Sequence, residues 1–187
     1  MFAYSSHRLW KAKSRTVRGR LRPRDRWSSS PAHLTLPYFA AVCEEFSRSV
    51  LLECSEPIVP LTHPLLERLW TAAEGKAETW PGQVEAWKEW HGVDLSGQPE
   101  YKSLRPIVEA RNAIVHGLGQ LTRRQTRKDG GAKVKRELAT VGIRTNGRQI
   151  LVDEAAMKVC ANAATAFINW LDLETQSRGL RTPLTPV

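Results

Sequence analysis

Apolar positions between residues 35 and 175 recur mostly at intervals of three and four, which is the spacing of one face of a helix. A first helix is predicted to begin at Thr35 and to bury the side that carries Phe39, Cys43, Phe46, Val50 and Cys54. Prolines end it, and a second helix is predicted from Thr62. Trp80-Pro81-Gly82 punctuates the chain before a short third helix that closes near Gly92.

In the second half of the chain, the helical spacing of apolar residues is interrupted once, by a segment with the pattern of a hairpin. Residues 101–121 predict a long helix, which is followed by a basic loop or by a helix end that runs into a loop. Residues 143–150 turn on Asn146-Gly147 and predict a small hairpin, after which Asp153 caps a last helix. The predicted fold is therefore all-α, a four- to five-helix bundle with a small β-hairpin insertion before the last helix.

Positive charge is concentrated at the N-terminus. The chain carries a formal net charge of +9, of which residues 1–30, with nine Lys or Arg and one acid, supply most. We expect a disordered basic arm over residues 1–30, a helical domain over residues 31–175 and a frayed tail over residues 176–187. The arm is either a solvated extension or a polyelectrolyte that binds nucleic-acid phosphates. Because residues 31–187 hold 19 bases and 18 acids, a domain that is basic all over is excluded.

Composition excludes several other classes of protein. No apolar run approaches the length of a membrane span, and no apolar stretch of a secretory signal follows the basic N-terminus. The three cysteines, Cys43, Cys54 and Cys160, are too few for a disulfide framework, which favours a reducing, cytoplasmic compartment. No metal-ligand spacing occurs among cysteines and histidines, so we expect neither a metal nor a cofactor. The tryptophans between Trp70 and Trp90 are predicted to be core or interface residues rather than a base-stacking stripe.

The helix over residues 101–121 carries the candidate chemistry. Its heptad seam consists of Leu104, Ile107, Arg111, Ile114, Leu118 and Leu121. An arginine on such a seam needs a carboxylate partner, a water-filled cleft or a bound anion, because arginine is almost never fully buried unless it is paired. Beside Arg111, the side chains of Glu109, Asn112 and His116 share one face of the helix.

These residue types limit the reaction. Arginine binds phosphate and keeps its charge, histidine moves protons near neutral pH, and asparagine orients its neighbours. Without a metal, such a set can help an RNA 2′-hydroxyl to attack its own phosphate. Two copies of the helix around a two-fold axis would supply two histidines, which favours a dimer. The structural alternative is that Arg111 pairs with Glu109 or with a carboxylate on another helix, and that His116 merely ends the helix.

The segment from Glu109 to Gly117, with Arg111, Asn112 and His116, resembles the signature of the HEPN superfamily. The resemblance covers roughly residues 35–175, and neither the basic arm nor the hairpin matches the common core of the family. It implies a small, all-helical dimer in which the two motifs face each other. Many members are metal-independent ribonucleases of toxin–antitoxin, phage-defence and RNA-processing systems. By resemblance, Arg111 and His116 act at the scissile phosphate and Asn112 helps to set the site.

The sequence thus predicts a homodimeric, metal-independent endoribonuclease. Seven bases and one acid lie between Arg123 and Arg136, and we expect the RNA backbone to contact Arg123, Arg124, Arg127 and Lys128, the alternative being plain solvation of these charges. A toxin of this kind would need restraint by a partner such as an antitoxin. Two other hypotheses stay open: a non-catalytic HEPN-like module that binds RNA or protein, and a DNA-binding bundle, which lacks a helix-turn-helix or zinc-finger signature.

Overall fold

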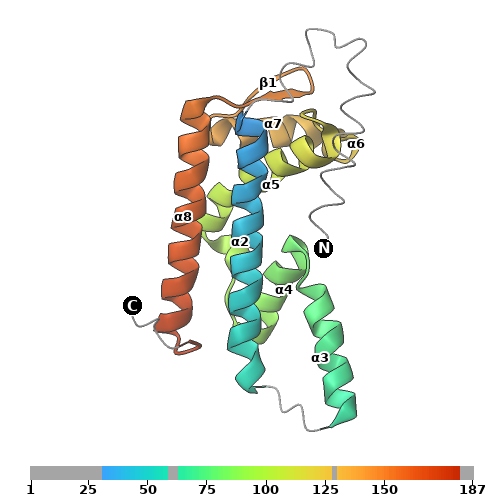
Figure 1. The fold of residues 1–187 in the computed structure, drawn as a ribbon, viewed down its shortest axis with the longest axis vertical. Helices are drawn as coiled ribbons and strands as arrows, with labels where there is room; N and C mark the ends of the chain where they lie inside the picture. Colours follow the sequence, from blue (N-terminus) through green and yellow to red (C-terminus); the bar gives the residue numbers. More distant parts are fainter. Residues whose placement is uncertain (1–30, 59–62, 128–129, 182–187) are drawn as a thin grey trace.

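The computed structural model describes residues 31–58, 63–127 and 130–181. Within these residues the chain forms seven α-helices and one two-stranded hairpin (Figure 1). The elements are α2 (Pro31–Ser55), η2 (Glu56–Ile58), α3 (Pro64–Lys76), α4 (Trp80–His91), η3 (Leu95–Gly97), α5 (Pro99–Gly117), α6 (Arg123–Thr126), α7 (Gly130–Thr140), β1 (Arg144–Asn146), β2 (Gln149–Leu151) and α8 (Glu154–Ser177). The predicted all-α bundle with a hairpin before the last helix is confirmed.

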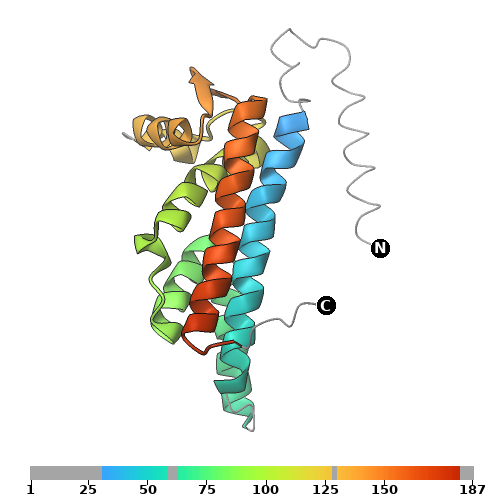
Figure 2. The ribbon, with the colours of Figure 1, turned by 90° about the vertical axis from the view of Figure 1, so that its left-hand side faces the viewer.

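The two longest helices, α2 and α8, lie side by side, and α5 packs against both of them (Figures 1 and 2). The core between them is joined to α4 by an aromatic cluster. Phe167 of α8 lies edge-on to Trp80 of α4 with ring centroids 5.7 Å apart, and Tyr101 of α5 lies 5.9 Å from Trp80. Trp87 is fully buried and its Nε1 donates to Ser47 Oγ of α2 at 3.1 Å. Burial of Trp80 and Trp87 confirms that these two tryptophans belong to the core.

Several predicted boundaries were wrong, for local reasons. The first helix begins at Pro31, before Thr35. The cap of α3 is His63, whose Nδ1 accepts from the Leu65 backbone N–H at 3.1 Å, whereas Thr62 lies outside the described residues. Trp80-Pro81-Gly82 is no break but the first turn of α4, because Thr79 caps the helix and proline is well suited to a first turn.

The basic segment after residue 121 is helical rather than a loop. It forms the short helix α6 and the longer helix α7, which explains why the bundle has more helices than the predicted four or five. Thr122 and Gln125 form a reciprocal capping box at the start of α6. Helix α7 is tied to α5 by an ion pair of 2.9 Å between Arg105 and Glu137.

The hairpin pairs Asn146 with Gln149, so its two turn residues are Gly147 and Arg148, one position later than the predicted Asn-Gly turn. The hairpin also forms backbone hydrogen bonds with the segment that follows α5. The Leu121 N–H donates to Arg148 O at 2.7 Å, and the Ile150 N–H donates to Gly119 O at 3.0 Å. The hairpin therefore holds the chain directly beyond the motif helix.

At the C-terminus, α8 continues to Ser177, and part of the segment expected as a frayed tail is packed. The Arg181 guanidinium lies 2.9 Å from Asp172 Oδ1 and 3.2 Å from Glu53 Oε1, which ties the end of the chain to α2. Residues 1–30, where we expected the basic arm, and residues 182–187 lie outside the described residues. No helix in the described part of the chain is both long enough and apolar enough to span a membrane.

Candidate functional site

Helix α5 buries a side that differs from the predicted seam. Leu104 and Ile107 are fully buried as expected, but the buried side continues through Ala110 and Ala113. Because the helix ends at Gly117, Leu118 leaves the seam and is 82% exposed. Arg111 lies half-buried at the edge of the packed side. The prediction that an arginine occupies the seam itself was therefore wrong. Because Arg111 is only half-buried, it does not need an ion-pair partner.

The motif residues occupy the outward side of α5. At about 100° per residue, Arg111, Asn112 and His116 surround Val115, which is 47% exposed. The Arg111 guanidinium donates from Nη1 to Asn112 Oδ1 at 3.2 Å, so the first two motif side chains are in direct contact. His116 is exposed, and within the described residues its ring has no hydrogen-bond or ion-pair partner. This strip presents a cation, a carboxamide and an imidazole to solvent.

A carboxylate on another helix feels the charge of the Arg111 guanidinium. It is the half-buried Glu44 of α2, and among the described residues the two side chains form no ion pair. Burial raises the pKa of the Glu44 carboxyl, and this effect exceeds the lowering by Arg111 and by a hydrogen bond from the Trp80 backbone. The sequence analysis missed Glu44 as a site residue. The signal available was only its place on the first helix, which does not reveal what that helix packs against.

Glu109 has a structural role that excludes the predicted alternative of pairing with Arg111. Gln125 of α6 donates from Nε2 to the Glu109 carboxylate at 2.6 Å and to its backbone carbonyl at 2.8 Å. Gln125 is itself buried and accepts from the Thr122 N–H at 2.9 Å. This network joins α6 to the motif helix, so the two helices meet at a corner held by side-chain hydrogen bonds.

The chain turns sharply after His116. Leu118 adopts a left-handed conformation with φ 52°, which is a strained arrangement for a bulky residue other than glycine. Gly119 follows with φ 84°, where a side chain would be strained as well. Leu118 is also the most exposed large apolar residue of the described chain. Its backbone strain and its exposed apolar surface both destabilise the fold, so such a residue directly beyond a motif points to a functional role.

The predicted RNA-binding residues lie just beyond this turn. Arg123, Arg124 and Arg127 are exposed on α6 and at its end, while Gln125 between them faces inward. Lys128 lies outside the described residues. The arginines therefore border the corner that α5 and α6 form, on a short helix and its C-cap.

Comparison with protein-family models, with curated proteins and with solved structures gave no match to this chain. The interpretation of the site therefore depends on its residues and their geometry. Within the described residues, no group of three or more His, Cys, Asp or Glu side chains is placed to hold a metal ion. The three thiols are buried, and burial raises the pKa of Cys43 to about 12 and that of Cys160 to about 11.

A second pair with possible chemistry is Ser55 of α2 with His91 of α4, where Oγ lies 2.8 Å from Nε2. Ser55 Oγ also donates to the Leu51 carbonyl of its own helix at 2.7 Å. A serine hydroxyl has one proton, so in this arrangement His91 donates to the oxygen instead of accepting from it. An activated serine nucleophile needs the opposite polarity. The pair is thus a contact between two helix ends, and burial lowers the pKa of His91.

The raised pKa of Glu44 predicts the effect of Glu44→Gln on stability. A carboxyl whose pKa is raised by folding stabilises the folded state while it is protonated, and this contribution is lost as the pH rises through the folded-state pKa. Glutamine keeps the neutral form at every pH. We therefore expect Glu44→Gln to have a higher Tm than the wild type at pH 7, with a difference that shrinks as the pH falls toward about 4.

Thermal unfolding followed by circular dichroism between pH 4 and pH 8 measures this difference. Glu85→Gln is the matched control, because Glu85 is an exposed carboxylate on α4 and its replacement should leave Tm nearly unchanged. A Tm at pH 7 that is lower for Glu44→Gln than for the wild type would show that the attraction to Arg111 outweighs the cost of burial.

Proposed function

We propose that the chain is a homodimeric, metal-independent endoribonuclease of the HEPN type, with one cleft built from two copies of α5. The observation that carries the proposal is the strip on the outer side of α5, on which Arg111 and Asn112 are half-buried and in contact while Val115 and His116 are exposed. It offers the cation and the proton-transfer group that cleavage through an RNA 2′-hydroxyl requires.

In the proposed reaction, the 2′-hydroxyl oxygen attacks the adjacent phosphorus and the bond from phosphorus to the 5′-oxygen breaks. The products are a 2′,3′-cyclic phosphate and a 5′-hydroxyl. One His116 takes the proton of the 2′-hydroxyl, and the His116 of the second copy gives a proton to the leaving oxygen. Arg111 stabilises the charge that develops on the phosphorane, and Asn112 holds the guanidinium in place through the bond at 3.2 Å.

Apolar side chains beside the strip support pairing of two copies. Leu118 and Val115 of α5 are exposed, and so are Leu34 and Tyr38 on the first turns of α2. The start of α2 is close to the end of α5, since the His33 ring lies 3.9 Å from where a Cβ would stand on Gly119. Exposed apolar residues on two neighbouring helix ends next to a charged motif are typical of an interface, and a two-fold axis there would bring the two motifs together.

The flanking charges fit an RNA substrate. Three arginines follow the strip on α6 and at its end, namely Arg123, Arg124 and Arg127. We expect them to contact the phosphates on either side of the scissile bond. The basic N-terminal segment adds affinity that does not depend on sequence. In a toxin–antitoxin or phage-defence setting in the cytoplasm, such an enzyme must be inhibited until it is needed. An antitoxin protein that binds over the strip would block access of RNA to it.

One observation favours a second candidate function, that of a non-catalytic HEPN-like module that binds RNA or protein. His116 has no partner within the described residues to orient its ring. Catalytic histidines are commonly held by a second group that fixes their tautomer. In a binding module, His116 contributes contacts alone, and its replacement lowers affinity without abolishing a reaction.

Cleavage of labelled single-stranded RNA in EDTA tests the proposed reaction. We expect the wild type to release products with a 2′,3′-cyclic phosphate, and Arg111→Ala and His116→Ala each to lower the rate by about a hundredfold or more. Matched controls are Arg105→Ala, on the same helix, and His63→Ala, at the exposed cap of α3. Equal cleavage by the wild type and both motif variants would contradict the proposal, as would no cleavage of any of several RNAs.

Salt dependence of RNA binding tests the role of α6. In a His116→Ala background that prevents cleavage, we expect Arg123→Ala/Arg124→Ala to flatten the plot of log affinity against log salt by about 1.4, or about 0.7 for each lost phosphate contact. Arg68→Ala/Lys76→Ala removes two exposed bases of α3 and serves as the control. The same slope in both double variants would show that the α6 arginines are merely solvated.

A further inference from the structure

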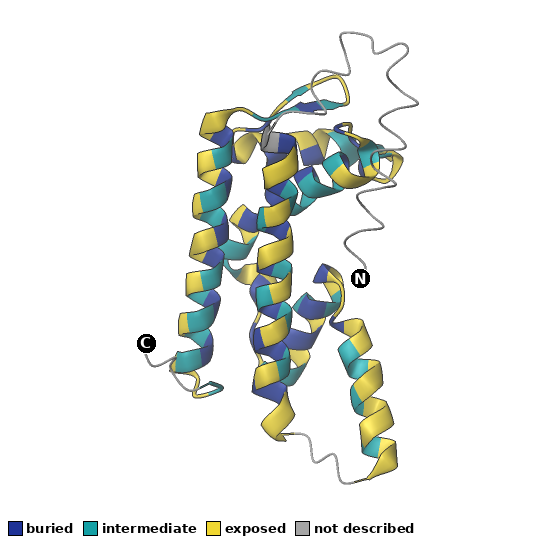
Figure 3. Ribbon diagram, viewed as in Figure 1, coloured by how far each residue is buried: buried dark blue, intermediate teal, exposed yellow. Residues whose placement is uncertain are grey.

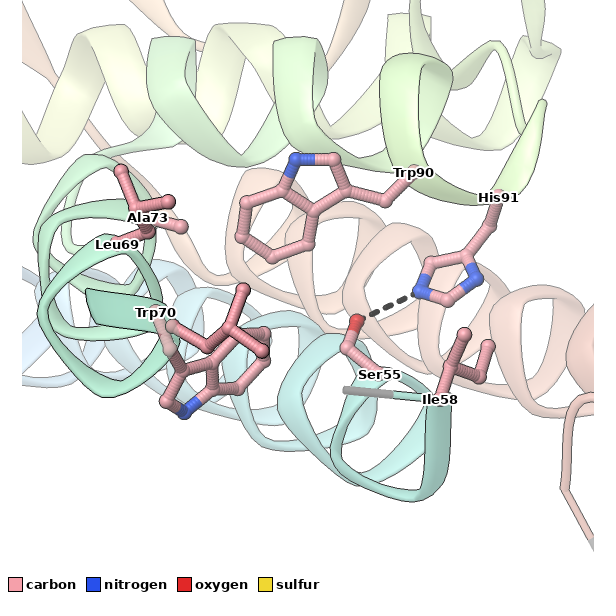
Figure 4. A pocket seen from close by; sticks show the side chains of 8 residues that line it. Ser55, Ile58, Leu69, Trp70, Ala73, Trp90 and His91 are labelled. Atoms are coloured by element: carbon pink, nitrogen blue, oxygen red, sulfur yellow. Dashed lines mark hydrogen bonds between the residues drawn. The ribbon is translucent and has the colours of Figure 1, made fainter. Parts of the chain in front are cut away.

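An apolar groove lies at the opposite end of the molecule from the hairpin, between α3 and α4. Its volume is about 280 Å³, and its apolar lining consists of Ile58, Leu66, Leu69, Trp70, Ala73 and Trp90. Trp70 and Trp90 extend into it from the two helices, while Ser55 and His91 close one end (Figure 4). No residue of the motif on α5 lines this groove.

The described residues leave the groove uncovered because α3 is poorly packed. The helix has no buried residue, and it packs mainly against α4, where the Trp70 and Trp90 rings lie 5.9 Å apart (Figure 3). Leu65 and Leu69 are each 58% exposed, and Ile58 is 64% exposed. An apolar surface of this kind on a soluble domain is usually covered by another segment or by a partner.

The segment that forms the groove is rich in acidic residues. Residues 53–91 contain seven acids and three bases, although the whole chain carries a net charge of +9. Glu67 and Glu74 lie two turns apart on α3, beside the side that carries Leu66 and Trp70. Glu53 is paired with Arg181, but within the described residues none of the other six carboxylates forms an ion pair. An apolar groove with neighbouring carboxylates is suited to a basic segment that has apolar anchors.

We propose that residues 8–17 of the same chain dock in this groove. They contain four Lys or Arg and no acid, and their apolar anchors are Trp10 and Val17. Arginines of the segment can pair with the neighbouring carboxylates and stack on the two groove tryptophans.

The length of the chain permits this docking within one molecule. Helix α2 separates Pro31 from the groove by about 37 Å, taking 1.5 Å for each of its 25 residues. The 14 residues from Val17 to Pro31 span up to about 48 Å when extended and the 21 residues from Trp10 span up to about 70 Å, so both anchors can reach the groove. Because the segment is tethered, its effective concentration is of the order of millimolar, so even weak contacts suffice for docking.

Docking would make two surfaces compete for the same basic segment: the apolar groove with its neighbouring carboxylates, and the phosphates of a nucleic acid. High salt would release the segment from the groove, since its charge pairs are exposed to solvent. Docking of the segment does not depend on cleavage of RNA by α5 and can be measured without RNA.

Limited trypsin digestion of the full chain tests the proposal, because the segment contains four trypsin sites, after Arg8, Lys11, Lys13 and Arg15. If the segment is docked nine-tenths of the time, Leu69→Asp should raise the initial cleavage rate within residues 8–17 about tenfold, since cleavage follows the undocked fraction. Trp10→Ala should give the same increase, and the double variant should add little to either one. Leu173→Asp, an exposed leucine of α8, is the matched control and should leave the rate unchanged.

Circular dichroism melts establish that Leu69→Asp folds, as expected for a residue that is already exposed. Equal cleavage rates in the wild type, Leu69→Asp and Trp10→Ala would overturn the proposal. A wild-type rate that rises on dilution would overturn docking within one molecule and assign the groove to the segment of a second copy. Loss of self-association in Leu69→Asp without any change in cleavage would assign the groove to an interface between domains.

Discussion

The end of α5 is fixed by backbone hydrogen bonds, and the geometry of the motif depends on this. The Gly119 N–H closes the helix on Ala113 O at 3.0 Å, and the next residues pair with the hairpin through Gly119 O and the Leu121 N–H. The Arg148 guanidinium adds a bond of 2.6 Å to Leu121 O. Because the chain is held on both sides of Leu118, His116 stays in the last turn of the helix and α6 starts at a defined angle.

The two sides of α5 have different roles, because one packs in the core and the other carries the candidate site. On its inner side, α5 offers small residues such as Ala110 and Ala113, which let α2 and α8 approach closely. On its outer side, it keeps Arg111, Asn112 and Val115 only partly covered. Glu44 reaches the edge of this strip from α2, so the electrostatics of the motif depends on the packing of two helices and not on the motif alone.

The sequence pattern predicted the elements better than their ends or contacts. Helical spacing, the Asp153 cap and the Asn-Gly turn located the last helix and the hairpin, because these signals are local. The same spacing placed Arg111 and Leu118 on a buried seam, since it could not show that the helix ends at Gly117. Glu44 and the bond between Glu109 and Gln125 were not predictable, because both depend on which helices pack together. The basic run from Arg123 was predicted to be a loop or a helix end that runs into a loop, whereas a capping box of Thr122 and Gln125 begins the helix α6 there.

The central claim is that two copies of α5 form one catalytic cleft, and mixing two inactive variants tests it most directly. Arg111→Ala and His116→Ala would be purified separately, mixed, allowed to exchange subunits and assayed for RNA cleavage in EDTA. A mixed dimer keeps one Arg111 and one His116, on different copies, so the account predicts that mixing restores a substantial part of the wild-type activity. Activity in the wild type that stays absent from the mixture, although subunit exchange is complete, would contradict a cleft shared between two copies.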